Sequence, residues 1–351
     1  MVVDLAKGAA ASAENPYPVT FMDECPDPTR TDGGWTDEYK TTKMVFRLVE
    51  PGTAKLGWGV NGFTDWNCAP VVTVTFKRPF YLAVFECTQG QAKLINGSWF
   101  GDQAHEFTGG RREMRPVSSA SWNAWRGSAA NGCCWPNDGS KVDPESLIGK
   151  LRARTGSDLF DMPTECEWEY AARAGAADAW GGEGLAPGQH GFAETGSASI
   201  TTNSVLNARG RYCFNGGFVK GEYGVLAPPS FSCGETNGTA VVGSYKPNAW
   251  GFYDMLGNAS ECTLDYFSGN RVSSPEFPGG WNGSRIATDP VGAPVPEDKM
   301  RSAWIYRVVK GGRWSQAPHW CALPSRNMDN VNMSAANAHG CRIAWRFPKE
   351  K

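Results

Sequence analysis

The chain has 351 residues, of which 42 are glycine, 23 are proline and 20% are charged. Its net charge of −2 argues against a nucleic-acid-binding surface, which needs a basic patch. No apolar run is long enough to span a bilayer, and the first residues lack the basic and then apolar pattern of a signal peptide. We therefore expect neither nucleic-acid binding nor a membrane-spanning segment.

Eleven cysteines are present, and no two of them have the CxxC spacing of a zinc ribbon. Because the number is odd, at least one thiol is unpaired within the chain. We expect most of these cysteines to be small buried hydrophobic residues.

Residues 1–40 are rich in Pro, Gly, Asp and Thr and are predicted to form an irregular N-terminal arm. Three β-branched or alternating segments then predict strands over residues 42–49, 71–76 and 79–87, with a short helix from Thr88. No domain boundary is evident after residue 40, so residues 41–351 are predicted to be a single domain.

Two helices are predicted, over residues 144–155 and 163–175. In the second helix, Thr164 and Glu167 have the spacing of a capping box, in which each side chain accepts a hydrogen bond from the other's backbone N–H. Its glutamates are predicted to lie on a solvated face. Residues 176–240 are predicted to form structured loops, because aromatic residues and cysteines persist through them.

The C-terminal part contains a strand around Val308 and Val309, a break at Gly311, a long polar segment and a second strand over residues 341–345. Loops of this length are uncommon inside compact domains and are usually functional. Bulky side chains within the segment favour a functional role over an ordinary surface excursion.

Several motifs occur in order along the chain: PFYLAVFECTQGQ, PVSSASWNAWRG, MPTECEWEYAARAG, VGSYKPNAWGFYDMLGNASECTLDYF, DPVGAP, RVVKGGRWS and GCRIA. This set resembles the formylglycine-generating enzymes and sulfatase-modifying factors over roughly residues 40–347. The resemblance implies an α+β fold, the C-type-lectin-like fold of the formylglycine-generating-enzyme type, with much irregular structure.

Catalytic members of that family oxidise a substrate cysteine with copper held by two cysteines, and the matching positions here are Gln316 and Cys321. Copper(I) is a soft ion that suits a thiolate pair, which a glutamine and one cysteine do not supply. The resemblance therefore implies that copper is not bound, unless Cys321 pairs in space with Cys341.

The family motif GNxWE contributes oxygen ligands to calcium, and it appears here as Gly257 to Glu261, with Ser260 and Cys262 where the family has tryptophan. Asn258 and Glu261 are the residues that the resemblance nominates as Ca²⁺ ligands. The alternative is that Glu261 forms a salt bridge and Asn258 lies in a turn.

The same fold has a non-catalytic use in the variable proteins of diversity-generating retroelements, in which the C-terminal loop is rewritten at adenines and binds ligands. The Asn, Ser, Asp, His and Ala residues of 313–339 are typical of such rewriting. Aromatic anchors with adaptable polar neighbours are also typical of recognition surfaces. The predicted ligand-contacting residues are Arg313, Ser315, Gln316, Ala317, His319, Trp320, Leu323, Asn327, Met328, Asp329, Asn330 and Asn337.

Within that segment, Trp314 is predicted to be buried and Trp320 exposed, while Arg326 and Arg342 brace the fold. The sequence thus predicts a non-catalytic protein that binds a protein or glycan ligand, outside the cytoplasm or at a cell surface. The alternatives are a divergent copper-dependent formylglycine-generating oxidase or a related sulfatase-modifying-factor enzyme, and a purely structural surface module.

Overall fold

The computed structural model describes the chain except for residues 31–32, 58–70, 103–108, 137–140, 183–203, 217–218, 221–225, 228–237, 268–285, 293–294, 301, 303, 317, 333–338 and 349–351. None of the helices in the described part is long and apolar enough to cross a membrane.

The largest sheet has six strands in the order β2-β1-β3-β6-β15-β7, and every neighbouring pair is antiparallel. The strands are β1 (Val2–Asp4), β2 (Val19–Thr20), β3 (Lys43–Val49), β6 (Phe80–Ala83), β7 (Phe160–Asp161) and β15 (Ala344–Arg346). This sheet joins the first residues of the chain to the last ones. Strand β3 confirms the strand predicted over residues 42–49, and β6 confirms part of the strand predicted over residues 79–87.

The N-terminal segment differs from the predicted irregular arm. Strand β1 pairs with both β2 and β3, and Val3, Leu5 and Tyr17 are buried in the core. Because the apolar run here is only a few residues long, its sequence shows no period, and its strand conformation is decided by pairing with β3.

A second sheet has the order β13-β12-β10-β14. Its strands are β10 (Ser260–Tyr266), β12 (Tyr306–Lys310), β13 (Asn327–Asn330) and β14 (His339–Gly340), and β14 runs parallel to β10. Residues 313–339, predicted to lack regular structure, therefore contribute an edge strand, part of β14 and the one-turn helix α6 (Pro318–Cys321).

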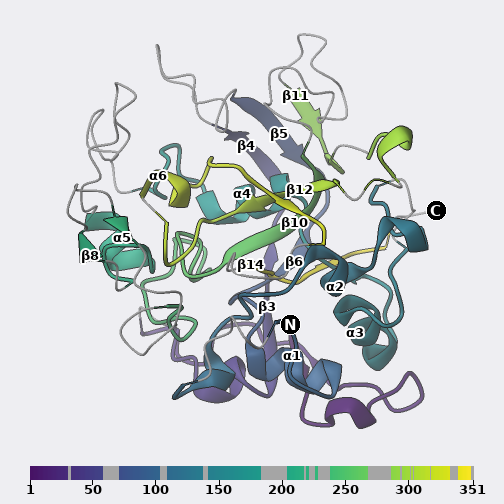
Figure 1. Cartoon of the computed structure of the whole chain (residues 1–351). Helices are drawn as coiled ribbons and strands as arrows, with labels where there is room; N and C mark the ends of the chain where they lie inside the picture. Colours follow the sequence, from purple (N-terminus) through teal and green to yellow (C-terminus); the bar gives the residue numbers. More distant parts are fainter. Residues whose placement is uncertain are drawn as a thin grey trace.

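Two smaller sheets and five further helices complete the regular structure of the described residues. The sheets are β11 (Ile286–Thr288), β5 (Val72–Phe76) and β4 (Gly52–Leu56), and β8 (Val219–Lys220) with β9 (Leu226–Ala227). The helices are α1 (Gln89–Asn96), α2 (Trp122–Arg126), α3 (Leu147–Thr155), α4 (Glu165–Arg173) and α5 (Ser204–Arg209), and short 3-10 turns lie at Gly8–Ala10, Asp37–Lys40, Arg112–Met114, Ala129–Asn131 and Glu297–Lys299. Helices α1, α2 and α3 lie together in Figure 1, with α5 and α6 on the other side of the molecule.

Helix α4 confirms the predicted capping box, since Thr164 and Glu167 each accept a hydrogen bond from the other's backbone N–H. The prediction of a solvated glutamate face is wrong. Glu169 is fully buried between Arg173 and Lys310, at 2.9 and 3.1 Å. The partner lysine lies about 140 residues away in sequence, so a local reading of the helix does not reveal it.

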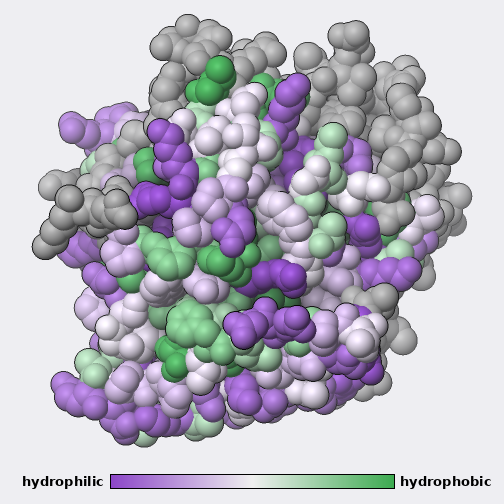
Figure 2. Space-filling model, turned by 180° about the vertical axis from the view of Figure 1, so that it is seen from behind, coloured by the Kyte–Doolittle hydropathy of each residue, from purple (hydrophilic) through white to green (hydrophobic). Residues whose placement is uncertain are grey.

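The core is formed by two large clusters of buried side chains, one containing Trp122 and Trp125 and the other Trp168 and Trp180. Eight of the nine described cysteines are buried, as predicted for small hydrophobic residues. The face seen in Figure 2 also carries hydrophobic side chains near its middle, flanked by hydrophilic ones.

Candidate functional site

The candidate site begins where β12 ends in a double-glycine turn. Gly311 and Gly312 have φ angles of 85° and 69°, in the left-handed region that favours glycine. A Cβ atom on Gly312 would lie 2.7 Å from the Cys321 sulfur. The turn therefore lets helix α6 pack directly against the end of β12.

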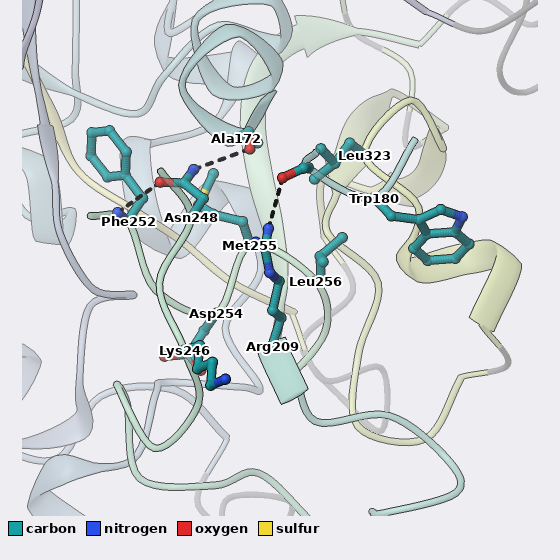
Figure 3. Close-up of a pocket in the computed structure, with 11 residues that line it drawn as sticks. Ala172, Trp180, Arg209, Lys246, Asn248, Phe252, Asp254, Met255, Leu256 and Leu323 are labelled. Carbon is teal, nitrogen blue, oxygen red and sulfur yellow. Dashed lines mark hydrogen bonds between the residues drawn. The ribbon is translucent and has the colours of Figure 1, made fainter. Parts of the chain in front are cut away.

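The aromatic and aliphatic residues of 313–339 are more buried than a display loop requires. Trp314 is buried, as predicted, whereas Trp320 is half-buried rather than exposed. Leu323 is buried in the wall of a cavity of about 10 Å³, which has room for about one water molecule (Figure 3). Leu323 is therefore an interior residue, and its prediction as a ligand contact is wrong.

The polar residues of the segment divide into two groups. Arg313, Ser315, Gln316 and Asn327 are half-buried, and Met328 is 46% exposed on the edge strand β13. Asp329 and Asn330 are buried and thus do not form an open contact surface. Ala317 and Asn337 lie outside the described residues, as does the side chain of His319.

Asp329 and His339 bring the middle and the end of the segment together. The Nε2 atom of His339 lies 3.3 Å from Oδ2 of Asp329, yet Oδ2 has no hydrogen-bond partner. Burial raises the pKa of Asp329 to about 7, and burial together with the nearby Arg313 lowers the pKa of His339 to about 3. The imidazole is therefore neutral at pH 7, and the carboxyl group is about half-ionised.

Five buried polar atoms on or against this segment have no hydrogen-bond partner among the described residues. They are Gln316 Oε1, Asp329 Oδ2, His339 Nδ1, Asn123 Oδ1 and Ser260 Oγ, which we call the polar cluster. Buried polar groups are nearly always paired, so such atoms mark a place where a partner is missing.

Contacts in the described part hold most of the polar cluster close together. Ser260 and His339 are register partners in the β10–β14 pair. Asn123 lies beneath the segment, where its backbone N–H donates to the Val331 carbonyl at 3.1 Å.

The sequence interpretation did not include Asn123, Ser260 or His339 among the site residues. One signal was available, because Ser260 and Cys262 are departures from the tryptophans of the family motif. Both face this cluster: Ser260 pairs with His339, and the charge of Asp329 helps raise the pKa of the Cys262 thiol, after burial itself.

The thiols are arranged differently from the predicted alternatives. Cys341 belongs to one core cluster and Cys321 to the other, so the suggested pairing of these two is not found. Cys213 is instead the neighbour of Cys321. It donates its backbone N–H to the Gln316 carbonyl at 3.1 Å, and the pKa of Cys321 is raised by burial and, to a smaller extent, by the charge of Cys213. Burial raises the pKa of Cys213 to about 12.

The residues nominated for calcium do not fit that ion. The Glu261 carboxylate accepts hydrogen bonds from Arg342 at 2.8 Å and from the Trp168 indole at 2.7 Å. The Asn258 amide bridges Glu86 and the backbone of Ala240, at 2.6 and 2.7 Å. With their oxygens occupied by protein donors, Asn258 and Glu261 form a turn and a salt bridge, which is the alternative named from the sequence.

Comparison with known proteins identifies the family. The profile of the "Sulfatase-modifying factor enzyme 1-like domain" family matches residues 35–347. The chain belongs to this family. It is 28% identical to the formylglycine-generating enzyme of Mycobacterium tuberculosis, over 72% of this chain and 76% of that enzyme. It is 25% identical to the formylglycine-generating enzyme of Bos taurus over 68% of this chain, and it spans about half of that enzyme's length (46%).

Two solved structures share the fold. Treponema denticola variable protein 1 matches with a TM-score of 0.54 and 18% identity, over 87% of this chain and 96% of that protein. PvdO from Pseudomonas aeruginosa matches with a TM-score of 0.54 and 20% identity, over 89% of this chain and 97% of that protein. These likenesses confirm the predicted fold, the C-type-lectin-like α+β fold of the formylglycine-generating-enzyme type.

Proposed function

We propose that this family member is a non-catalytic binding protein whose recognition surface lies on residues 313–339. The observation that carries the proposal is the polar cluster, in which three unpartnered buried atoms lie on this segment and two, on Asn123 and Ser260, lie on elements that pair with it. A surface segment that leaves hydrogen-bonding groups unpaired gains free energy when a ligand supplies the missing partners.

The recognition surface is smaller than the sequence suggested. Its accessible members in the described part are Arg313, Ser315, Gln316, Trp320, Asn327 and Met328. A half-buried tryptophan beside adaptable polar side chains is a composition that suits a protein or glycan ligand. Such a ligand fits a location outside the cytoplasm or at a cell surface.

The fold shared with Treponema denticola variable protein 1 supports a further part of the proposal, that the segment is diversified by a retroelement. Sequencing the 3′ end of the gene and its flanks tests this part. We expect a near-copy of codons 311–345 that differs only at adenines, beside a reverse-transcriptase gene. A flank without such a copy would contradict diversification and leave the binding surface as a fixed one.

Binding itself is tested by screening the purified protein on protein and glycan arrays. The double variant Asn327→Ala with Met328→Ala should lose at least tenfold of the affinity for any ligand found. Ile286→Ala is the matched control, because this residue is also on an edge strand and 64% exposed, but on β11 in another sheet. Equal loss in both variants would place the ligand elsewhere.

The second candidate function is a divergent copper-dependent oxidase. Two observations favour it: the curated relatives are formylglycine-generating enzymes, and Cys213 provides a second thiol beside Cys321. Two thiols would suit a soft ion such as copper(I), although burial raises the pKa of both and opposes the thiolate form that binds metal.

Copper binding separates the two candidates. Under the binding-protein proposal, Cu(I) competition with a chromophoric chelator shows the same weak affinity for the native chain, Cys213→Ser and Cys321→Ser. Tight binding by the native chain that either serine variant abolishes would favour the oxidase.

A further inference from the structure

A large cavity lies apart from the proposed recognition surface. It has a volume of about 500 Å³ and is lined by residues at the end of β15, at the start of α4 and around Trp135 and Pro290, and we call it the β15 cavity. None of its described lining residues belongs to 313–339. Pockets that bind small molecules have volumes of roughly 300–1,000 Å³ and mostly apolar walls. The β15 cavity therefore has the size of a small-molecule site.

The walls of the β15 cavity are largely aromatic and are fixed by contacts within the chain. Phe76 and Phe80 are buried, with their ring centroids 5.6 Å apart, while Phe347 is 37% exposed. The Trp135 indole N–H donates to the Val291 carbonyl at 2.6 Å, which holds that ring in place. Aromatic rings pack well on one another in offset or edge-to-face contacts, so such walls favour a flat apolar group.

Arg346 places a hydrogen-bond donor in the same cavity. Its Nε atom donates to Glu167 at 2.8 Å, and its Nη2 atom donates to the Met162 carbonyl at 2.9 Å and to the second Glu167 oxygen. Its Nη1 atom has no hydrogen-bond partner among the described residues and is not one of the buried unpaired atoms, and the side chain is 23% exposed. The guanidinium group is therefore fixed in one orientation, with one nitrogen open to the cavity.

The inner carboxylates of the cavity already have donors. Both Glu167 oxygens accept hydrogen bonds from Arg346. Asp161 accepts from Arg126 at 3.1 Å and from Arg152 at 3.0 Å. The open polar group in the interior of the cavity is thus a donor, and only a ligand with an acceptor can pair with it.

The charged residues at the rim also favour an anion. Asp289 accepts the Lys77 backbone N–H at 2.8 Å, and Asp158 acts electrostatically on Arg152. Arg78 is exposed, lines the cavity and forms no ion pair in the described part of the chain. Both rim carboxylates thus have interactions within the protein, whereas the rim cation is left to attract a negatively charged ligand.

We propose that the β15 cavity binds a small aromatic carboxylate. The ring packs against the aromatic walls, and a carboxylate oxygen accepts a hydrogen bond from Arg346 Nη1. Hydrogen bonds between a charged donor and an ionised acceptor are about twice as strong as neutral ones. A cationic ligand would be repelled by Arg78 and would leave Nη1 unpaired. This site is separate from the proposed recognition surface and does not depend on it.

Four probes test the proposal: benzoate, benzamide, benzylammonium and acetate. Each is titrated over the millimolar range into the ¹⁵N-labelled full chain, while the Trp135 indole signal and the Phe347 amide signal are followed. We expect benzoate to shift both signals saturably and to bind about tenfold more tightly than benzamide or acetate, with no effect of benzylammonium. The absence of a saturable shift with benzoate would overturn the inference, as would equally tight binding of benzylammonium or acetate.

The first variant is Arg346→Lys, which keeps a cation beside Glu167 but removes the open guanidinium nitrogen. Its affinity for benzoate should fall about tenfold. Arg111→Lys is the matched control, because this arginine is also paired with a carboxylate, that of Asp37 at 3.4 Å, but lies outside the cavity. Benzoate affinity that is unchanged in folded Arg346→Lys would contradict the assigned contact.

A second variant tests the site without touching a buried ion pair. Val291 is 36% exposed and lines the cavity, so Val291→Trp should fill part of it and weaken benzoate binding. Val19→Trp, at a residue 41% exposed on β2, is the control and should bind benzoate like the native chain. Equal binding by both variants would place benzoate outside the cavity.

The proposed function and this inference fail separately. The double variant Asn327→Ala with Met328→Ala should bind benzoate as the native chain does, because neither residue lines the cavity. Loss of benzoate binding in that double variant would assign the benzoate site to the recognition surface and overturn the inference.

Discussion

Arg342 is a fully buried guanidinium whose hydrogen bonds tie distant parts of the chain together. It donates to the Glu261 carboxylate, to the carbonyls of Ala83 and Val84 and to that of Tyr253, all within 3.3 Å. Its role as a brace was predicted from the sequence. The predicted role of Glu261 as a calcium ligand does not fit these contacts, because its carboxylate already has a partner about 80 residues away, which the motif does not reveal.

Replacing Glu261 by glutamine should destabilise the fold by about 3–5 kcal/mol, since it leaves the guanidinium buried without its counter-ion. Urea unfolding with calcium and with a chelator measures this, and the loss should be the same in both. The control is Glu145→Gln, which removes an exposed partner of Lys150 and should change stability by less than about 1 kcal/mol. A loss that appears only with calcium present would restore the metal-site interpretation.

At the scale of elements, the N-terminal strand shows how tertiary pairing decides a structure that local sequence does not. Helix α4 was predictable because its capping box is formed by residues close in sequence. Strand β5 was predictable because buried and less buried residues alternate over its five positions. Strand β1 spans three residues and α6 four, too few for any period to appear. The polar composition of 313–339 likewise gave no indication of the edge strand β13. In that strand the Met328 backbone N–H donates to the side chain of the neighbouring Asn327 at 2.9 Å.

If the first residues belong to the core, Leu5→Ala should cost about 2–5 kcal/mol in unfolding free energy, because it leaves a cavity at a fully buried position. Val19→Ala, in the exposed strand β2, serves as the control and should cost less than about 1 kcal/mol. A Leu5 variant as stable as the control would show that the segment is the irregular arm predicted from its composition.

For the whole molecule, motifs in the correct order predicted the fold over nearly the full chain, and the family and structural comparisons confirm it. The proposed recognition surface was predictable only as a segment. Which of its side chains face inward depends on β12, β10 and residues around Asn123, all of which are remote in sequence. Leu323, Asp329 and Asn330 were therefore assigned to the surface although they are buried.

Stability should rise as the pH falls from about 7 to about 5. Burial raises the pKa of Asp265 and Asp329 to about 7, from an ordinary value near 3.8, so the stability they contribute is lost as pH rises through that interval. His339 acts in the opposite sense, because its pKa is lowered to about 3 and its contribution is lost below pH 6.5. Burial also raises the pKa of Asp254 to about 6 and that of Glu86 well above its ordinary value, so both act in the same sense as Asp265 and Asp329. The raised carboxyl groups outnumber the one imidazole and leave a net gain on the order of 1 kcal/mol per pH unit.

Thermal unfolding between pH 5 and pH 8 measures this, with Asp265→Asn as the variant that should flatten the profile. A midpoint that is highest at pH 8 in the native chain would contradict the assignment of these carboxyl groups.

Recognition without chemistry is the central claim, and the most direct test is to offer the purified protein copper(I), oxygen and a cysteine-containing peptide, and to follow the peptide by mass spectrometry. Because the resemblance places Gln316 at a position where the oxidases have a copper-binding cysteine, we predict that the peptide thiol is converted to formylglycine no faster than without protein. Conversion that requires the protein and is abolished in Cys321→Ser would contradict the claim and identify the chain as an oxidase.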